Sequence, residues 1–196
     1  MDKKITLRTV VVGGLDTNCY ILGCTQTKRA VIIDPGAEPE KIKAVIKQAG
    51  LKAEAIILTH AHWDHTGGLT GFDLPVYVHR LDSVYLGSGK TESSPYNLKL
   101  VKDKQQILLG DLILDVLHTP GHTLGSICLK VNNILLSGDT LFCSGIGRTD
   151  SPGGSYQQIV DSLNKKVMVL EGSTDVYPGH GPQTTIEREK KGIYHL

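Results

Sequence analysis

The sequence predicts an α/β (α+β) protein in which two mixed sheets pack face to face with helices outside them. Two observations lead to this fold class. Short apolar segments rich in β-branched residues occur in two groups along the chain, and each group is followed by a helical pattern. A sheet must bury its apolar face on another layer, so two such halves predict two sheets in contact. The 196 residues contain no linker-like stretch, and we expect a single domain over residues 1–196.

The first half contains the strands expected at residues 5–12, 19–22, 30–33, 56–58 and 76–78. A helix is expected between the third and fourth of them. Pro39 suits its first turn, and Gly50 ends it. Ile42, Val45 and Ile46 fall on one face of this helix, which we expect to pack on the first sheet.

The second half contains the strands expected at residues 107–109, 112–117, 126–131, 134–136 and 176–177. The dipeptides Gly110-Asp111 and Asn132-Asn133 are plausible hairpin turns between neighbouring strands of this group. Helices are expected at residues 156–163 and, with many charged side chains, at 185–191.

Composition excludes several classes of protein. The formal net charge is +1, with 21 basic against 20 acidic residues, so no overall field attracts nucleic acid or an anionic membrane. The four cysteines form no CxxC pair, which suits a reducing cytosol, and we expect Cys19 and Cys128 to be buried apolar groups. No apolar stretch has the length of an export signal or a membrane span. We expect a cytoplasmic protein, and the sequence does not predict its oligomeric state.

A cluster of metal-ligand side chains follows the strand expected at residues 56–58. His60, His62, Asp64 and His65 lie within six residues of one another. Because side chains alternate along a strand, His60 and His62 should project the same way and hold one ion together. The turn that follows should direct Asp64 and His65 toward a second ion, about 3.5 to 4 Å from the first. This density of imidazole and carboxylate groups predicts a transition-metal site.

Three further ligand candidates each follow a strand and a glycine in the second half. They are His122, Asp139 and His180, in the pairs Gly121-His122, Gly138-Asp139 and Gly179-His180. A glycine lets the backbone pass close to an ion and adopt positive φ values. One such pair alone is weak evidence, but together with the first cluster the three complete a ligand set.

The other histidines are interpreted as structural or surface residues. His118 still belongs to a strand, where a histidine usually finds a backbone partner. His79 and His195 have no comparable context, and we treat both as ordinary surface residues.

These motifs, in this order, resemble those of the metallo-β-lactamase fold superfamily, and within it the glyoxalase II-like hydrolases. The resemblance covers nearly the whole chain and implies a four-layer αβ/βα sandwich with two divalent metal ions, Zn²⁺ in the first place, with Fe or Mn as alternatives. It assigns one metal to His60, His62 and His122, the second metal to Asp64, His65 and His180, and the bridging position to Asp139. Asp34, which ends a strand, becomes a residue behind the ligands that orients one of them.

The implied activity is metal-dependent hydrolysis of a thioester, of the hydroxyacylglutathione hydrolase type. Two divalent cations lower the pKa of a bridging water to near 7, and one of them polarises the carbonyl. Asp64 and Asp139 are the candidate catalytic carboxylates. A thiolate, with a pKa of about 8.5, leaves without a strong general acid. Ser126 and Ser137 lack the context of a nucleophile elbow, so covalent catalysis is disfavoured.

Substrate contacts are expected from two loops, because the helical C-terminal domain of two-domain glyoxalase II has no counterpart after His180. The loop at residues 86–104 carries Lys90 and Tyr96, and the loop at 144–156 carries Arg148. Arg148 could contact the substrate directly or form an ion pair with Asp150 that fixes the loop. We favour the ion pair. Short hydrolases of this group would be expected to have Phe where Ser151 stands.

Two alternatives stay open. A persulfide dioxygenase of the same fold would use a single iron, on His60, His122 and Asp139. The residues around His180 resemble the hydrolase ending more closely. Lactonase, β-lactamase or nuclease activity is also compatible with this fold, since a fold does not fix a function.

Overall fold

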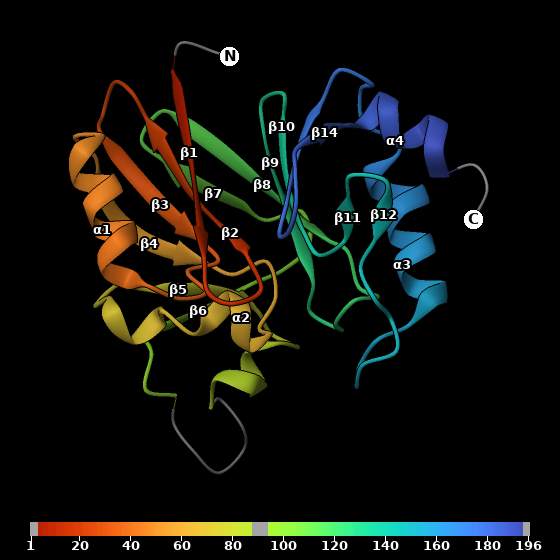
Figure 1. Cartoon of the computed structure of the whole chain (residues 1–196), viewed down its shortest axis with the longest axis horizontal. Helices are drawn as coiled ribbons and strands as arrows, with labels where there is room; N and C mark the ends of the chain where they lie inside the picture. The colour runs from red at the N-terminus through yellow and green to blue at the C-terminus, as the bar shows by residue number, and fades with distance from the viewer. Residues whose placement is uncertain (1–3, 88–93, 194–196) are drawn as a thin grey trace.

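The computed structural model describes residues 4–87 and 94–193, and it contains the predicted pair of mixed sheets. The first sheet has the strand order β1-β2-β3-β4-β5-β6 and the second the order β14-β13-β10-β9-β8-β7. In Figure 1 helix α1 lies outside the first sheet, and helices α3 and α4 lie on the opposite side of the molecule, outside the second. The chain therefore forms four layers, helix, sheet, sheet and helix.

The first sheet combines antiparallel and parallel pairing. Strands β1, β2 and β3 pair antiparallel, whereas β3, β4, β5 and β6 are parallel neighbours. Its strands are β1 (Ile5–Val12), β2 (Thr17–Cys24), β3 (Arg29–Ile33), β4 (Lys52–Ile57), β5 (Val76–His79) and β6 (Leu98–Val101). Every residue of β2 is buried, because this strand has one apolar cluster on each face.

The second sheet is antiparallel except for the parallel pair β10 and β13. Both predicted hairpin turns are present, between β7 and β8 and between β9 and β10. The strands are β7 (Gln106–Leu109), β8 (Leu112–His118), β9 (Ile127–Val131), β10 (Ile134–Gly138), β13 (Asp175–Pro178) and β14 (Thr184–Thr185). A separate small hairpin pairs β11 (Leu141–Phe142) with β12 (Gly145–Ile146).

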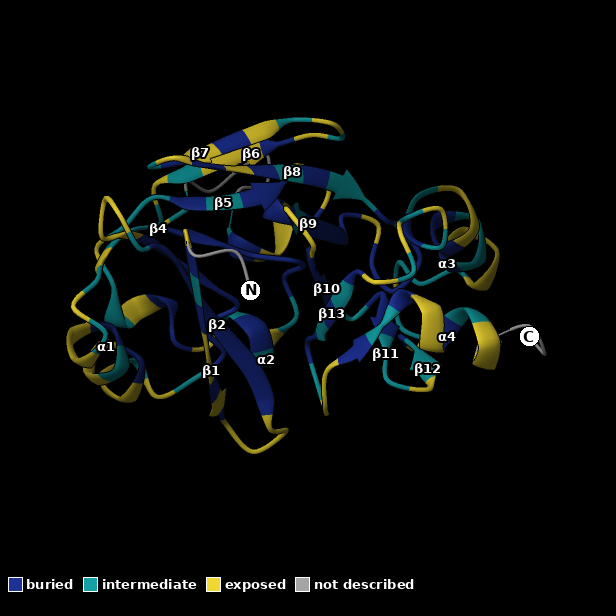
Figure 2. Cartoon of the chain, turned by 90° about the horizontal axis from the view of Figure 1, so that it is seen from above, coloured by how far each residue is buried: buried dark blue, intermediate teal, exposed yellow. Residues whose placement is uncertain are grey.

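Helices cover the outer faces of both sheets, and in Figure 2 their exposed residues lie on the sides turned away from the sheets. The long elements are α1 (Pro39–Gln48), α3 (Tyr156–Ser162) with its π-helical continuation η3 (Leu163–Val167), and α4 (Ile186–Ile193). Ile42 and Ile46 of α1 are buried as predicted. Short helices follow β4 and β5: α2 (Trp63–Thr66), η1 (Leu69–Gly71) and η2 (Ser83–Leu86). None of the described helices is both long and apolar enough to cross a membrane.

Three apolar clusters form the core. One lies between the sheets and includes Leu22 and Ile33 of the first sheet and Leu114 and Leu129 of the second. The other two lie under α1 and under α3 with α4. Cys128 belongs to the last cluster and is fully buried, as predicted for a cysteine that acts as an apolar group.

The sequence missed the short strands. β6 lies in the segment expected to be a loop at residues 86–104, and β11, β12 and β14 have only two residues each. β4 begins at Lys52 rather than at Ile56. The prediction missed its first residues because they are partly polar and mostly not fully buried. Such strands form through pairing with a neighbour rather than through an apolar run of their own.

Candidate metal centre

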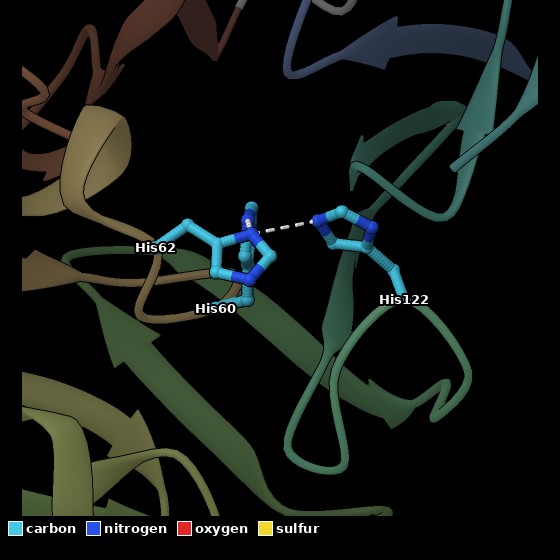
Figure 3. Close-up of side chains that lie close together, drawn as sticks. All are labelled: His60, His62 and His122. Atoms are coloured by element: carbon cyan, nitrogen blue, oxygen red, sulfur yellow. Dashed lines mark hydrogen bonds between the residues drawn. The ribbon is translucent and has the colours of Figure 1, made fainter. Parts of the chain in front are cut away.

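Three imidazoles converge where the two sheets meet. Nδ1 of His62 lies 3.1 Å from Nε2 of His60 and 2.9 Å from Nε2 of His122. Figure 3 shows His60 and His62 on the segment that follows β4, with His122 reaching them from the loop between β8 and β9. The three nitrogen atoms lie within 4.8 Å of one another, so this group could hold one metal ion. Three nitrogen ligands and an open position are typical of a catalytic zinc site.

Local backbone geometry explains why neighbouring histidines take different directions. His62 has φ −66° and ψ 150°, so the chain is still extended there, and His60 and His62 reach the same group as predicted. Helix α2 begins at the next residue, Trp63. The helical turn carries Asp64 and His65 round to a second group of side chains, which is also the predicted arrangement.

The second group consists of Asp64, His65 and His180. Oδ2 of Asp64 lies 3.4 Å from Nε2 of His65 and 3.2 Å from Nε2 of His180. The hydroxyl of Thr17 on β2 donates a hydrogen bond to the same oxygen at 3.2 Å. The ligand atoms of this group again lie within 4.8 Å of one another.

Asp139 lies between the two groups. Its Oδ1 is 3.5 Å from Nε2 of His65, and its Oδ2 is 3.5 Å from Nε2 of His122. Gly179 packs against this carboxylate so closely that an added Cβ would lie 2.1 Å from Oδ1. Gly138, just before Asp139, has φ +50°, as predicted for a glycine that directs a ligand. Gly179 has no positive φ, and the close approach of its backbone to the carboxylate is what requires glycine there.

Backbone carbonyl groups orient two of the histidines. Nδ1 of His122 donates to the carbonyl of Arg148 at 2.8 Å, and Nδ1 of His180 donates to the carbonyl of Leu15 at 3.0 Å. With the proton on Nδ1, Nε2 presents its lone pair to the centre of the site. Sequence reasoning missed these contacts, since a backbone acceptor has no residue signature.

Asp34 supports both groups from behind. Its carboxylate accepts hydrogen bonds from the N–H of Thr59 at 2.7 Å and from the hydroxyl of Thr59 at 2.6 Å. The same hydroxyl lies 3.2 Å from Nδ1 of His60, and Oδ2 of Asp34 lies 3.0 Å from Nδ1 of His65. Asp34 is buried, and its contacts are those expected of a residue that orients ligands.

Histidines in the two groups have pKa values shifted in opposite directions. Burial and the surrounding histidines hold the pKa of His60 well below its usual value, and burial with His122 lowers the pKa of His62. Burial alone would lower the pKa of His65, but Asp34 and the other carboxylates outweigh it and raise that pKa to about 9. The hydrogen bond to Asp64 raises the pKa of His180. His60 and His62 of the first group are thus held as neutral imidazoles, while the second group pairs imidazoles with carboxylates.

Unpartnered buried atoms indicate that a cation fits this site. Among the described residues, three buried polar atoms lack a hydrogen-bond partner: Nδ1 and Nε2 of His65 and Oδ1 of Asp139. Nδ1 of His65 has Asp34 beside it at 3.0 Å. A buried polar atom without a partner is costly, and Nε2 of His65 and Oδ1 of Asp139 lie 3.5 Å apart, where a cation would contact both. The donor set of imidazole nitrogens and carboxylate oxygens suits zinc, iron or manganese.

Comparison with known proteins identifies the family. A model described as the metallo-β-lactamase superfamily matches residues 12–180. The chain belongs to the metallo-β-lactamase superfamily. This member is 37% identical to a probable metallo-hydrolase of Bacillus subtilis, over 93% of each chain. It is 28% identical to a hydroxyacylglutathione hydrolase of Haemophilus influenzae, over 95% of this chain and 96% of the relative.

Solved structures of the superfamily share the whole fold. The B3 metallo-β-lactamase BLEG-1 has a TM-score of 0.86 at 34% identity, covering 97% of this chain and 99% of its own. TTHA1623, in a di-iron-bound form, has a TM-score of 0.84 at 34% identity, covering 96% and 100%. ETHE1 from Myxococcus xanthus has a TM-score of 0.79 at 29% identity, covering 96% and 83%.

Of the predicted substrate residues, Arg148 contacts the first ligand group through its backbone carbonyl, which accepts from His122. Lys90 lies outside the described residues. Tyr96 packs against the apolar cluster on the outer face of the first sheet. Arg148 forms the predicted ion pair with Asp150, at 2.8 Å between Nε and Oδ1, and both side chains are exposed.

Two further histidines form a stacked pair. His118 has the predicted backbone partner, since its Nε2 lies 2.9 Å from the carbonyl oxygen of Leu124. The prediction that His79 is a surface residue was wrong, because it is 8% exposed and its ring stacks on His118 with centroids 4.0 Å apart. His195 lies outside the described residues.

Proposed function

We propose that this member of the superfamily is a thioester hydrolase of the hydroxyacylglutathione hydrolase type that uses two divalent metal ions. The observation that carries the proposal is the pair of complete three-ligand groups with Asp139 between them. The relation to the hydroxyacylglutathione hydrolase of Haemophilus influenzae supports the choice of a thioester. Zn²⁺ is the metal we propose, with Fe or Mn as alternatives, and the di-iron form of TTHA1623 supports iron as one of them.

The chain's own residues hold and orient the reacting groups. When bound, two such ions supply a water of lowered pKa and a Lewis acid for the carbonyl oxygen. His60, His62 and His122 would hold one ion, and Asp139, which lies between the two groups, would be shared by both ions. Asp64, His65 and His180 would hold the second ion, and we propose that the carboxylate of Asp64 also takes the proton of the attacking water. A thiolate leaving group, with a pKa of about 8.5, then needs no further acid.

The free cysteines support a reducing compartment such as the cytoplasm as the place of action. Cys19, Cys24 and Cys128 are buried, Cys143 is half-buried, and all four are unpaired. We propose a small-molecule thioester as the partner, without nucleic acid or membrane.

A persulfide dioxygenase is the second candidate, and one observation favours it. His60, His65 and Asp139 also form a compact group of two imidazoles and a carboxylate, the set that non-haem iron oxygenases use. In the predicted set His122 takes the place of His65, and its Nε2 lies 3.5 Å from Oδ2 of Asp139, the same distance as that between Nε2 of His65 and Oδ1. We rank this candidate second, because it leaves His62, Asp64 and His180 without a role.

The test is a substrate panel on the metal-loaded protein. Thiol release from S-D-lactoylglutathione is compared with oxygen uptake on glutathione persulfide and with hydrolysis of a lactone and a β-lactam. We expect thiol release, and we expect Asp139→Asn to abolish it. Asp103→Asn is the matched control, since Asp103 pairs with Lys166 at 2.7 Å, away from both ligand groups. Oxygen uptake without thiol release would reject the thioesterase.

A further inference from the structure

A buried carboxylate outside the ligand set joins the two segments that carry the first ligand group. Asp82, just before η2, is fully buried. Its Oδ2 accepts hydrogen bonds from the N–H of Ala61 at 3.0 Å and from the hydroxyl of Thr123 at 2.8 Å. Its Oδ1 accepts a hydrogen bond from the N–H of Gly125 at 2.7 Å. Three donors from two distant segments therefore meet on one side chain.

The donors are immediate neighbours of the first ligand group. Ala61 stands between His60 and His62 on the segment that follows β4. Thr123 follows His122 in the loop between β8 and β9. These segments extend from different sheets. The sheets are linked by an isolated bridge between Thr17 and His180 and by single backbone hydrogen bonds, such as that from the N–H of Ile127 to the carbonyl of Thr59 at 2.8 Å. The distance between the imidazoles consequently depends on links such as this carboxylate.

The carboxylate is held tightly from the side of the β8–β9 loop. An added Cβ on Gly125 would lie 2.4 Å from Oδ1 of Asp82, so the loop backbone packs directly against it. The hydroxyl of Ser126 lies 2.7 Å from that of Thr123 and accepts a hydrogen bond from the N–H of Thr123 at 3.0 Å. Neither the acceptor nor the donors can shift freely, and the link is stiff.

We infer that Asp82 is a positioning residue for the first metal group, setting the separation of the His60–His62 segment from His122. The inference rests on the ligand set proposed above. Asp34 has a comparable place behind His60 and His65, one residue of each group, so two buried carboxylates support the site. Ligand geometry must be held within about 0.5 Å, and removing a partner behind the ligands typically weakens metal binding about 10- to 100-fold.

Two variants test the link. Asp82→Asn keeps the size of the side chain but turns one oxygen into an NH₂ group that faces a donor. Thr123→Val removes one donor at nearly constant shape and serves if the first variant does not fold. Glu189→Gln is the matched control, because Glu189 is also a buried carboxylate with two donors, the hydroxyl of Thr184 and the N–H of Ser144, and it touches no ligand candidate.

The measurement is a Zn²⁺ titration of the metal-free proteins in competition with a chelator, alongside their Tm. A His62→Ala variant shows which Zn²⁺-binding step belongs to the first group, because that step should be absent from its titration. We expect Asp82→Asn to raise the Kd of that step about 10- to 100-fold and Thr123→Val to raise it about tenfold, while the other step stays within twofold. Glu189→Gln should lower only the Tm.

A purely structural role gives a different result. Asp82→Asn and Thr123→Val would then lower the Tm as the control does and leave the Kd of the His62-dependent step unchanged, which would overturn the inference. If the wild-type protein has no His62-dependent step, the proposed ligand set fails and the inference fails with it. A protein that binds both ions but hydrolyses no thioester would overturn the proposed activity alone.

Discussion

Replacing Gly179 by Ala should disable the site with a single methyl group. The added Cβ would lie 2.1 Å from Oδ1 of Asp139 and 2.8 Å from Cε1 of His65, where ordinary contacts are 3.4–4 Å. The backbone cannot retreat easily, because Gly179 donates to the carbonyl of Gly138 at 2.8 Å and accepts from the N–H of Asn18 at 2.8 Å. The carboxylate must then move by about 1 Å, a displacement that can cost about 100-fold in rate.

We therefore expect Gly179→Ala to lower kcat/KM for S-D-lactoylglutathione by at least about 100-fold, or about 2.7 kcal/mol, and to lose bound metal. Thiol release gives the rate, elemental analysis the metal content, and circular dichroism the fold. Gly192→Ala on α4 is the control, since its Cβ would meet no atom within 4 Å, and it should behave as wild type. Full metal content with activity within about threefold of wild type would refute the reasoning from close packing.

Three further predictions concern the histidines and the substrate. His122→Ala should lose metal and His118→Gln retain it, and equal loss in both variants would contradict their assignment. Burial and His118 lower the pKa of His79 to about 4 against about 6.5 in the unfolded chain, so the unfolded state binds more protons between these values. The free energy of unfolding should therefore fall as the pH falls from 6.5 to 4. Chemical denaturation should show that this fall is about 2 kcal/mol smaller in His79→Gln than in the wild-type protein. The same pH profile in both proteins would contradict the prediction. Carrier selectivity should be loose, with S-D-lactoylglutathione and an N-acetylcysteine thioester differing by less than about 100-fold in kcat/KM; a steeper preference would indicate a specific carrier site.

The convergence of the histidines could be predicted because local rules govern it. Period-two alternation places His60 and His62 together, and a helical turn redirects Asp64 and His65. In the second half, His122, Asp139 and His180 each follow a strand, so their side chains lie at one edge of the sheet. The sheets themselves were predictable from apolar runs long enough to bury a face.

The contacts behind the ligands could not be predicted, because they join residues far apart in the chain. Asp82 reaches Ala61 across 21 positions and Gly125 across 43, and no motif marks it. The carbonyls of Leu15 and Arg148 act through the backbone, so residue type carries no signal. Thr59 was the detectable omission, since a hydroxyl directly before a ligand cluster commonly hydrogen-bonds within it.

The proposed hydrolysis depends most on two metal ions, one bound by each ligand group. Elemental analysis of the purified protein, with thiol release and oxygen uptake measured on the same sample, tests this directly. We expect two metal ions per chain and thiol release from S-D-lactoylglutathione without oxygen uptake. One iron per chain with oxygen uptake on glutathione persulfide would contradict it.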